Sequence, residues 1–206
     1  DASWSRGLGD VYKRQNWRYN DPSGHSSVFE TTHIISSKYT SFYEDFPLPN
    51  DAADYPSHEE LLRYFQGYTD HFDLEKNIKF NTEVIHCSQE ANHMWKIKWK
   101  NLTTNEVKTD IFDALVVCNG HHHEPRFPKY PGKFSGDYLH SHQYKKALPF
   151  KDKKVLVIGG GNSACDVAVE TARISKTTAI SWRRGYDLIP NLSLIHISEP
   201  TRPRRI

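Results

Sequence analysis

The chain has 206 residues, with 27 basic against 25 acidic side chains and a formal net charge of +2 at pH 7. No apolar run approaches the ~20 residues that a membrane-spanning helix needs, so no membrane span is predicted. The cysteines Cys87, Cys118 and Cys165 have neither paired nor metal-type spacing, which excludes a disulfide scaffold and is typical of the reducing cytoplasm.

The two ends of the chain are predicted to derive from a sequencing adaptor. Codons for residues 5–15 can be written so that their reverse complement encodes residues 192–202. Residues 1–15 and 192–206 are therefore left out of fold reasoning, and the insert between them is interpreted as an internal gene fragment. Without the six basic and three acidic flank residues, 21 basic and 22 acidic residues remain. The charge balance thus does not indicate a nucleic-acid partner.

The first half of the insert combines an irregular segment, one helix and short strands. Residues 16–56 show no periodic pattern, which inside an ordered enzyme is typical of a segment that lines a site. Ser57-His-Glu-Glu60 has the form of a capping box, and apolar residues at helical spacing predict an amphipathic helix over 58–72. A period of two then predicts three short strands, at 78–87, 94–100 and 106–111.

The second half has the pattern of two Rossmann-like units that meet near residue 150. Asp113–Cys118 is predicted as a buried apolar strand that ends at Asn119-Gly120. A new βαβ unit follows, with its strand, helix and strand at 153–158, 162–174 and 177–182. The pattern predicts an α/β fold with two dinucleotide-binding domains, both of them truncated.

A glycine-rich turn connects the strand and the helix of this βαβ unit. Gly159-Gly-Gly161-Asn162-Ser163-Ala164 matches G-x-G-x-x-A. The first glycine permits the tight turn, the second lets the backbone approach a pyrophosphate, and a small third residue lets the helix pack on the strand. The N–H groups that begin the helix face the phosphates. We therefore predict that Gly159, Gly161, Asn162, Ser163 and Ala164 bind a dinucleotide, with a tight structural turn as the alternative.

The end of the second strand indicates which dinucleotide is bound. NAD-binding units place an acidic residue there for the ribose 2′-OH, but this chain has Trp182-Arg183-Arg184-Gly185. Two guanidinium groups suit a 2′-phosphate through charge-assisted hydrogen bonds. We predict that Arg183 and Arg184 select NADPH over NADH, and the alternative is a solvated basic turn.

A second motif lies a few residues before this unit. Residues 134–144 read F-x-G-x-x-x-H-x-x-x-Y, with Phe134, Gly136, His140 and Tyr144 at the fixed positions. By residue type alone these are packing residues, a turn and a histidine that bonds within a loop. In this placement the motif resembles the signature of the flavin-containing monooxygenases, which use FAD, NADPH and O2 to oxygenate soft nucleophiles. The resemblance implies that the stretch connects the FAD and NADPH domains and that His140 couples nicotinamide position to flavin chemistry.

The resemblance covers nearly the whole insert. Trp17-Arg-Tyr19 resembles the family's G-G-x-W-R/K-F/Y element near the flavin, which implies that Trp17 binds FAD. Ser37-Lys38 with the later Asp45–Pro49 resembles the family's S-K…D-F-P-x-P segment. Val116–His122 resembles its V-x-C-x-G-H-H strand end, where Gly120 lets the chain pass close to FAD.

One position departs from the family pattern. Many members carry an Asn over the flavin two residues before the Ser-Lys pair, and this chain has Ile35 there. Ser36 and Ser37 are the candidates to substitute for that Asn, so they join His140 as the predicted catalytic residues.

Two other groups of residues receive no catalytic role. His121-His122-His123 with Cys118 offers adjacent side chains that rarely point at one ion, and no second ligand pair has a zinc-type spacing. No metal site is therefore predicted. An aromatic cluster is interpreted as core rather than as a substrate wall, and its members are Tyr39, Phe42, Tyr43 and Phe46.

The family resemblance also implies a division of the chain into domains. Residues 16–150 are predicted to be part of an FAD-binding domain, including the linker motif 134–144. Residues 151–191 are predicted to be the start of an NADPH-binding domain inserted into it. The FAD fingerprint expected upstream of Trp17 is not in the chain, nor are the sheet strands expected beyond residue 191. The fragment alone is therefore expected to bind FAD poorly and to be inactive.

The implied activity is oxygenation of an amine nitrogen or a sulfide sulfur by a C4a-hydroperoxyflavin formed from NADPH-reduced FAD and O2. The implied partners are that small substrate and O2, without nucleic acid, in the cytoplasm, and a homo-oligomer is one allowed state. One alternative is a Baeyer–Villiger or N-hydroxylating monooxygenase; the Baeyer–Villiger signature usually ends in Trp where this chain has Tyr144. The other is an NADPH-binding flavoprotein that does not oxygenate.

Overall fold

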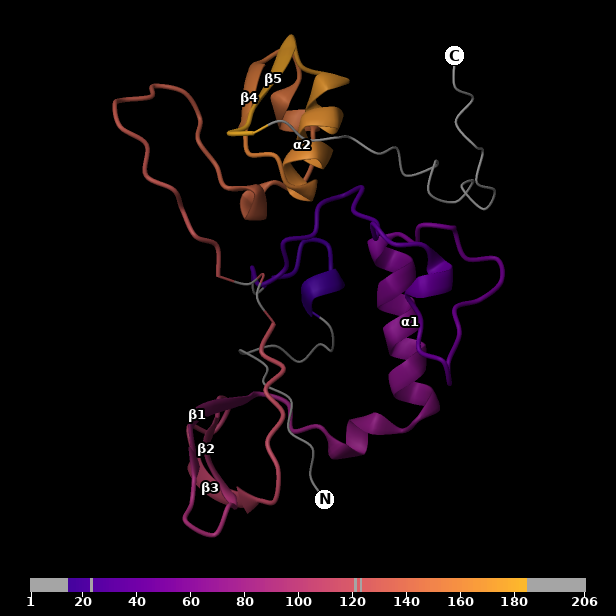
Figure 1. Cartoon of the computed structure of the whole chain (residues 1–206), viewed down its shortest axis with the longest axis vertical. Helices are drawn as coiled ribbons and strands as arrows, with labels where there is room; N and C mark the ends of the chain where they lie inside the picture. The colour runs from indigo at the N-terminus through magenta and orange to yellow at the C-terminus, as the bar shows by residue number, and fades with distance from the viewer. Residues whose placement is uncertain (1–14, 23, 121, 123, 185–206) are drawn as a thin grey trace, which may run out of the picture. The chain divides into compact units, whose positions relative to one another are not determined.

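The computed structural model describes residues 15–22, 24–120, 122 and 124–184 (Figure 1). Within these residues no helix is both long enough and apolar enough to cross a membrane. The chain divides into two compact units. The first combines residues up to Ser26 with Leu61–Arg126, and the second combines Ser27–Glu60 with the residues from Phe127 on. The predicted boundary between an FAD and an NADPH domain near residue 150 stays a prediction.

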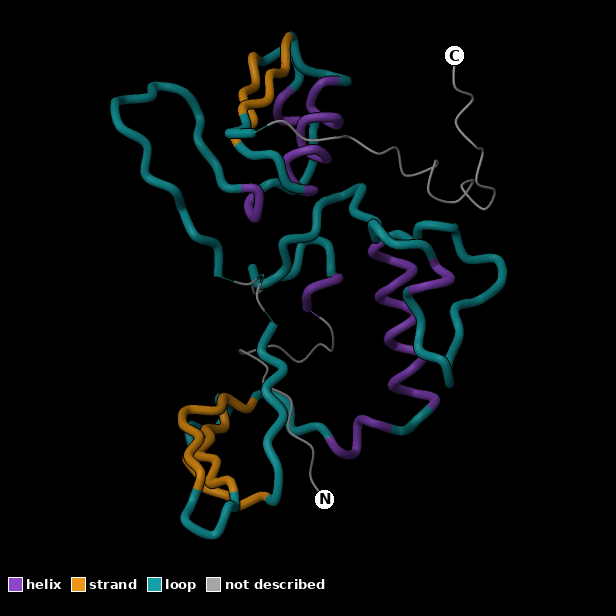
Figure 2. The backbone as a smooth tube through the Cα atoms, in the orientation of Figure 1, coloured by secondary structure: helices purple, strands orange, loops and turns teal. Residues whose placement is uncertain are grey.

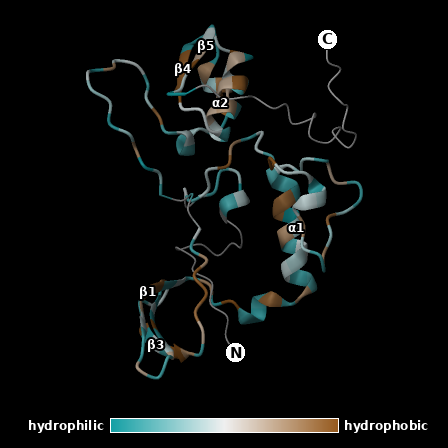
Figure 3. Cartoon of the chain, in the orientation of Figure 1, coloured by the Kyte–Doolittle hydropathy of each residue, from teal (hydrophilic) through white to brown (hydrophobic). Residues whose placement is uncertain are grey.

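Helix α1, His58–His71, begins at the predicted capping box. The N–H and Oγ of Ser57 donate to Glu60 Oε2 at 2.8 and 2.9 Å, and the Glu60 N–H donates to Ser57 Oγ at 3.3 Å. These bonds satisfy backbone donors that the first helical turn leaves without partners. Leu61 and Tyr64 lie on one face and are buried, and apolar and polar segments alternate along the helix (Figure 3). The predicted amphipathic helix is confirmed.

Three antiparallel strands of the first unit form a sheet in the order β1, β2, β3 (Figure 2), with bounds Thr82–Gln89, Trp95–Asn101 and Val107–Phe112. All three strands were predicted, although β1 begins at Thr82 rather than at residue 78. Residues 78–81, which follow the short 3-10 turn Leu74–Asn77, are not part of a strand. Asn101 Oδ1 accepts the N–H groups of Thr103 and Thr104 at 2.9 Å each. This side-chain turn closes the polar loop between β2 and β3.

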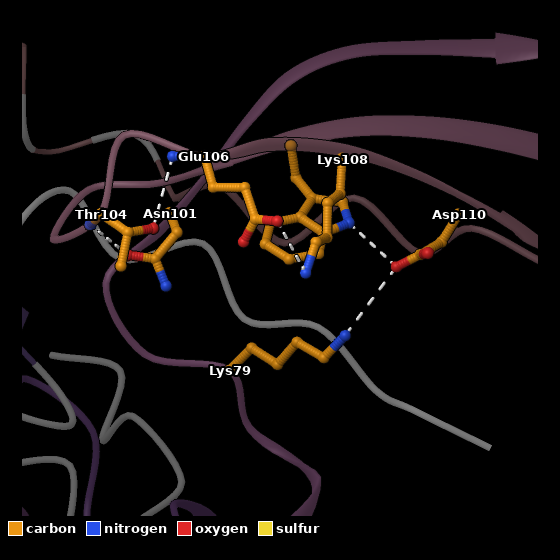
Figure 4. Close-up of polar contacts among 7 residues, drawn as sticks. Lys79, Asn101, Thr104, Glu106, Lys108 and Asp110 are labelled. Atoms are coloured by element: carbon orange, nitrogen blue, oxygen red, sulfur yellow. Dashed lines mark hydrogen bonds and ion pairs between the residues drawn. The ribbon is translucent and has the colours of Figure 1, made fainter.

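One face of this sheet carries a cluster around Trp99, and Figure 4 shows Lys79, Lys108 and Asp110 of this cluster. Trp99 is buried, and its indole N–H donates to Asp110 Oδ2 at 2.9 Å. Lys79 Nζ lies 4.9 Å from the ring centroid and 3.8 Å from Asp110 Oδ2, and Lys108 Nζ lies 6.0 Å from the same ring. The polar end of the indole is thus paired and its ring interacts with two cations. The cluster joins β2, β3 and the residues that precede β1.

The second unit contains a parallel strand–helix–strand element. Strand β4, Lys154–Ile158, pairs in parallel with β5, Thr177–Ser181, and helix α2, Asn162–Ala172, connects them and contacts both. Val155 and Val157 are half-buried, whereas the alternate residues of β4 are exposed. Because strand side chains alternate between faces, α2 covers one face of this sheet. The predicted βαβ unit is confirmed, and so is the α/β fold class.

The buried strand predicted at Asp113–Cys118 is wrong. These residues have no regular secondary structure, and Val116 and Val117 are 81% and 72% exposed. A continuous apolar strand is stable only between neighbouring strands and beneath covering layers, and the described residues give this segment no partner strand. The apolar pattern shows that the segment could be buried. It does not show whether other strands pack against the segment.

The capping box predicts the effect of a single substitution. Ser57→Ala removes the oxygen that accepts the Glu60 N–H, so we expect the free energy of unfolding to fall by about 1 kcal/mol. Urea unfolding followed by far-ultraviolet circular dichroism measures the difference. Ser57→Thr retains the oxygen and serves as the control, with stability close to that of the original chain. Equal stability of all three chains would contradict the assignment.

Candidate functional site

The turn between β4 and α2 depends on Gly159. Its φ is 140° and its N–H donates to the Ser181 carbonyl oxygen at 2.8 Å. This φ favours glycine, since side-chain-bearing residues rarely adopt it. A Cβ on Gly159 would lie 3.4 Å from the Ala164 Cβ, so helix and strand approach closely there. Gly159 and Ala164 therefore serve the geometry of the turn.

Gly161 has a different surrounding. It is the N-cap of α2, with extended backbone at φ −84° and ψ 176°, and no side chain caps the helix start. The Ala164 and Cys165 N–H groups bond to the Gly161 carbonyl oxygen at 3.0 and 3.1 Å. A Cβ on Gly161 would meet no atom within 4 Å. An uncapped helix N-terminus beside open space can receive an anion, because its first N–H groups and the helix dipole both favour negative charge.

The two predicted arginines lie at the same edge of the sheet as this turn. Ile158 and Ser181 are paired in the parallel register, so the glycine turn after β4 and the Arg183-Arg184 pair after β5 leave the sheet at its carboxyl edge. Both arginine side chains are exposed. Ligands of open α/β sheets bind at this edge. The structure therefore brings the glycine motif and both arginines together.

His140 is held at the start of a short 3-10 turn, Ser141–Gln143. Its Nδ1 accepts the His142 N–H at 3.1 Å, and its own N–H donates to Gln143 Oε1 at 2.9 Å. A neutral imidazole that accepts through Nδ1 carries its proton on Nε2. His140 thus bonds within its loop, as its residue type suggests, and this bonding favours the tautomer with the proton on Nε2.

The last residue of the signature, Tyr144, is 1% exposed. Its hydroxyl donates to Glu170 Oε2 of α2 at 2.7 Å, and its ring meets Phe29 edge-on at a centroid distance of 5.5 Å. Burial, the larger cause, and the hydrogen bond to Glu170 raise the pKa of Tyr144 far above its usual value. Phe134, at the other end of the signature, is exposed and contacts Gly136 instead. Packing is therefore the role of Tyr144 but not of Phe134.

Ser36 and Ser37 lie beside a short 3-10 turn, Lys38–Thr40. Ser36 Oγ is 2.6 Å from Ser41 Oγ, and Ser37 Oγ is 3.5 Å from Thr40 Oγ1. Lys38 Nζ donates to the carbonyl oxygens of Asn50 and Ala52 at 3.0 and 2.6 Å. Each serine hydroxyl thus bonds to a residue within five positions in the sequence, whereas Lys38 connects its own turn to the backbone of residues 50–52.

The residues next to these serines are exposed rather than packed. Ile35 is 58% exposed, and Tyr39 and Tyr43 are 66% and 48% exposed. The interpretation of Tyr39, Phe42, Tyr43 and Phe46 as core is therefore wrong for the first three, which are exposed, while Phe46 is half-buried. The segment supplies too few apolar partners of its own to cover these rings.

Trp17 and Gly120, the two predicted flavin-binding residues, belong to the first unit. Trp17 is half-buried in a 3-10 turn, Gln15–Trp17. Gly120 has φ +68°, and a Cβ on it would lie 3.7 Å from Asn16 Nδ2. The structure therefore places the Trp17 turn next to Gly120, although the two are a hundred residues apart in the sequence.

Of the histidine run, His121 and His123 lie outside the described residues, and Cys118 is exposed. Among the described residues, no group of three or more His, Cys, Asp or Glu side chains is arranged to hold a metal ion.

A family model described as flavin-binding monooxygenase-like matches residues 5–194. The chain belongs to this family. It is 37% identical over 177 residues to flavin-containing monooxygenase 5 of Rattus norvegicus, covering 82% of this chain and 33% of that protein. It is also 37% identical over 185 residues to dimethylaniline monooxygenase [N-oxide-forming] 2 of Oryctolagus cuniculus, covering 86% of this chain and 35% of that protein.

Solved structures agree with the assignment. S-allyl-L-cysteine S-oxygenase from Allium sativum superposes with a TM-score of 0.73 at 28% identity, over 90% of this chain and 48% of that one. The chain spans about a third of the length of the curated relatives it matches. The flavin-binding monooxygenase-like family consists of oxidoreductases that use FAD and NADPH, as predicted from the sequence.

Sequence reasoning missed two acidic residues of α2. Glu170 accepts the Tyr144 hydroxyl, and Asp166, one turn earlier, is half-buried near His33. Burial raises the pKa of the Asp166 carboxyl, and the charge of His33 opposes that rise. Their spacing of four places both carboxylates on one helix face, but nothing in the sequence pairs either of them with the signature motif.

The two glycines predict opposite responses to substitution. Gly159→Ala forces a side chain into a φ of 140° and against Ala164, so we expect a loss of at least about 1 kcal/mol of stability. Gly161→Ser enters open space at a φ that any residue adopts, and its hydroxyl can cap α2, so stability is expected to stay equal or rise. Thermal unfolding of the two variants tests the pair. Equal destabilisation would show that the turn geometry is misassigned.

Proposed function

We propose that this chain belongs to an NADPH- and FAD-dependent monooxygenase that oxygenates an amine nitrogen or a sulfide sulfur. The observation that carries the proposal is the carboxyl edge of β4 and β5, where an uncapped helix start with open space at Gly161 lies beside Arg183 and Arg184. Family membership supports the flavin-dependent part of the proposal.

The residues at this edge fit NADPH. The backbone N–H groups of Asn162 and Ser163 begin α2 and can donate to a pyrophosphate, since no side chain caps them. Arg183 and Arg184 offer planar donors to a 2′-phosphate, and no carboxylate at this strand end selects a 2′-OH instead. Residues 151–191 are accordingly assigned to NADPH binding.

The Trp17 turn and Gly120 fit the approach of a flat cofactor. Gly120 has the left-handed φ that favours glycine and no Cβ to occupy the space beside Asn16. The exposed backbone there can pass close to a ring system. FAD, when bound, supplies hydride acceptance and activation of O2, which protein side chains do not provide.

His140, Ser36 and Ser37 are assigned positioning and hydrogen-bonding roles. His140 presents an Nε2–H donor whose tautomer is set by the bond of Nδ1 to His142. Ser36 and Ser37 directly follow Ile35 in the sequence, and Ile35 stands where many family members have Asn. These groups orient reactants and exclude water; none of them needs to act as a nucleophile.

Amine and sulfide substrates are favoured by the relatives. The rabbit relative is named for N-oxide formation, and the garlic structure is that of an S-oxygenase. Tyr144 distinguishes the chain from the Trp-ending Baeyer–Villiger signature. Oxygenation of a ketone is therefore the second candidate.

The activity is tested on the full-length enzyme that carries this chain. We expect bound flavin, NADPH-dependent O2 uptake, and conversion of N,N-dimethylaniline to its N-oxide or of methyl phenyl sulfide to its sulfoxide. Product analysis by mass spectrometry separates the candidates. Conversion of cyclohexanone alone would indicate the Baeyer–Villiger reaction, and release of H2O2 without any oxygenated product would indicate a flavoprotein that does not oxygenate.

Nucleotide choice is tested on the same enzyme. Arg183→Ala and Arg184→Ala remove hydrogen bonds to a charged group, each worth roughly 1.5–3 kcal/mol. We therefore expect the ratio of kcat/KM for NADPH over NADH to fall about 10- to 100-fold. Arg173→Ala is the matched control, because Arg173 follows α2 at its far end and is exposed. An unchanged ratio in both strand-end variants would overturn the assignment.

A further inference from the structure

Tyr144 connects three stretches of the second unit. Its hydroxyl donates to Glu170 of α2 at 2.7 Å. Its ring packs edge-on against Phe29 at 5.5 Å and lies 5.7 Å from the Phe150 ring. It is among the largest fully buried side chains of the described residues. A single side chain thus joins the signature motif, the segment before residue 30 and the nucleotide-binding helix.

The neighbouring residue extends this junction along the backbone. The Glu30 N–H donates to the Lys145 carbonyl oxygen at 2.8 Å, and Lys145 Nζ lies 3.2 Å from the Val28 carbonyl oxygen, to which it donates. Segments more than a hundred residues apart in the sequence are therefore hydrogen-bonded side by side. Tyr144 and Lys145 thus both contact residues 28–30.

From there the connection continues toward Ser36 and Ser37. The His58 N–H donates to the Thr32 carbonyl oxygen at 2.9 Å, and the Ile34 N–H donates to the Pro56 carbonyl oxygen at 3.0 Å. These bonds hold residues 32–34 against the start of α1. The two serines thus follow a segment that is held at Glu30 by Lys145 and at residues 32–34 by residues 56–58.

At the other end of the connection lies the nucleotide-binding turn. Glu170 is eight residues after Asn162, so about 12 Å of helix separates it from the α2 N-terminus. A helix behaves as a rigid rod over this length. A contact that fixes Glu170 therefore also limits how the N-terminus of α2 can tilt.

We propose that the Tyr144–Glu170 hydrogen bond is a positioning contact, which holds the nucleotide-binding end of α2 in register with His140 and with the segment that leads to Ser36 and Ser37. The inference rests on the proposed function, because it assigns the contact a consequence for hydride delivery. It names Tyr144 and Glu170 as positioning residues, not as catalytic ones.

The hydroxyl and the ring of Tyr144 have separable roles. The ring fills the space beside Phe29 and Phe150 and would do so equally in phenylalanine. The hydroxyl remains a donor at all ordinary pH values, because burial and the Glu170 carboxylate raise the pKa of Tyr144. Tyr144→Phe therefore removes the hydrogen bond and retains the apolar packing.

A control for general destabilisation is available one residue along α2. Thr171 is fully buried; its Oγ1 donates to the Val167 carbonyl oxygen at 2.7 Å and accepts the Thr178 hydroxyl of β5 at 3.4 Å. Thr171→Val removes a buried hydroxyl from the same turn of α2 without touching the signature motif. Glu170→Gln is the conservative variant, since its amide oxygen still accepts the Tyr144 hydroxyl.

The first measurement is hydrogen–deuterium exchange of the 206-residue chain, followed by peptide mass spectrometry. Tyr144→Phe is expected to speed exchange about ten-fold both in α2 and in the backbone pairing of Glu30 with Lys145. Thr171→Val is expected to speed exchange in α2 and β5, which Thr171 contacts, but not in the pairing of Glu30 with Lys145. Faster exchange confined to α2 in Tyr144→Phe would overturn the inference, because the contact would then not connect the two segments.

The second measurement is stopped-flow reduction of the flavin by NADPH in the full-length enzyme. Tyr144→Phe is expected to slow the reduction step roughly ten-fold or more, since small misplacements of reactants cost large factors in rate. The KM for NADPH is expected to change less than two-fold, because the glycine turn and both arginines are intact. The single variants Glu170→Gln and Thr171→Val are each expected to retain most of the reduction rate of the unsubstituted enzyme.

The outcomes separate this inference from the function on which it rests. If the unsubstituted enzyme holds no flavin or is not reduced by NADPH, the proposed function fails. If the enzyme is reduced normally and Tyr144→Phe has the same reduction rate, the function stands and the positioning role is wrong. A slow reduction shared equally by Tyr144→Phe and Thr171→Val would likewise reject the positioning role in favour of general destabilisation.

Discussion

The parallel pairing of β4 with β5 is the constraint on which the proposed site depends. Because both strands run in the same direction, the turn after one and the arginines after the other leave the sheet at the same edge. The hydrogen bond from the Gly159 N–H to the Ser181 carbonyl oxygen extends the pairing into the turn itself. Loss of this register would separate the backbone proposed to bind phosphate from Arg183 and Arg184, which are proposed to distinguish two nucleotides.

Residues 27–60 of the second unit show how a segment without periodic structure is held in place. Residues 27–60 contain no strand and only one short 3-10 turn before α1, so they must satisfy their backbone groups elsewhere. They do so with the Lys145 carbonyl oxygen, with the start of α1, and with the Lys38 ammonium, which donates to two carbonyl oxygens of the same segment. The segment predicted to line a site is thus held by polar contacts more than by a core.

The parts of this architecture that local chemistry specifies were predictable from the sequence. The capping box at Ser57, the strands of the antiparallel sheet and the glycine turn each depend on residues close together in the chain, and all were predicted. The misassigned strand at Asp113–Cys118 and the exposed rings of Tyr39 and Tyr43 depend on what lies against them, which a local pattern does not contain. The Tyr144–Glu170 bond joins residues 26 apart in sequence, and no spacing rule connects a loop tyrosine with a helix glutamate.

At the carboxyl edge of β4 and β5, the backbone and the side chains have different proposed roles. The groups proposed to bind phosphate are backbone N–H donors, which every substitution but proline retains and which do not distinguish one dinucleotide from another. The proposed selectivity therefore lies with Arg183 and Arg184, whose side chains are exposed. Under the proposed function, nucleotide preference would change without disturbing the turn, whereas the position of the nucleotide would depend on what contacts α2. In this chain the helix is held at Glu170, by a residue of the signature motif itself.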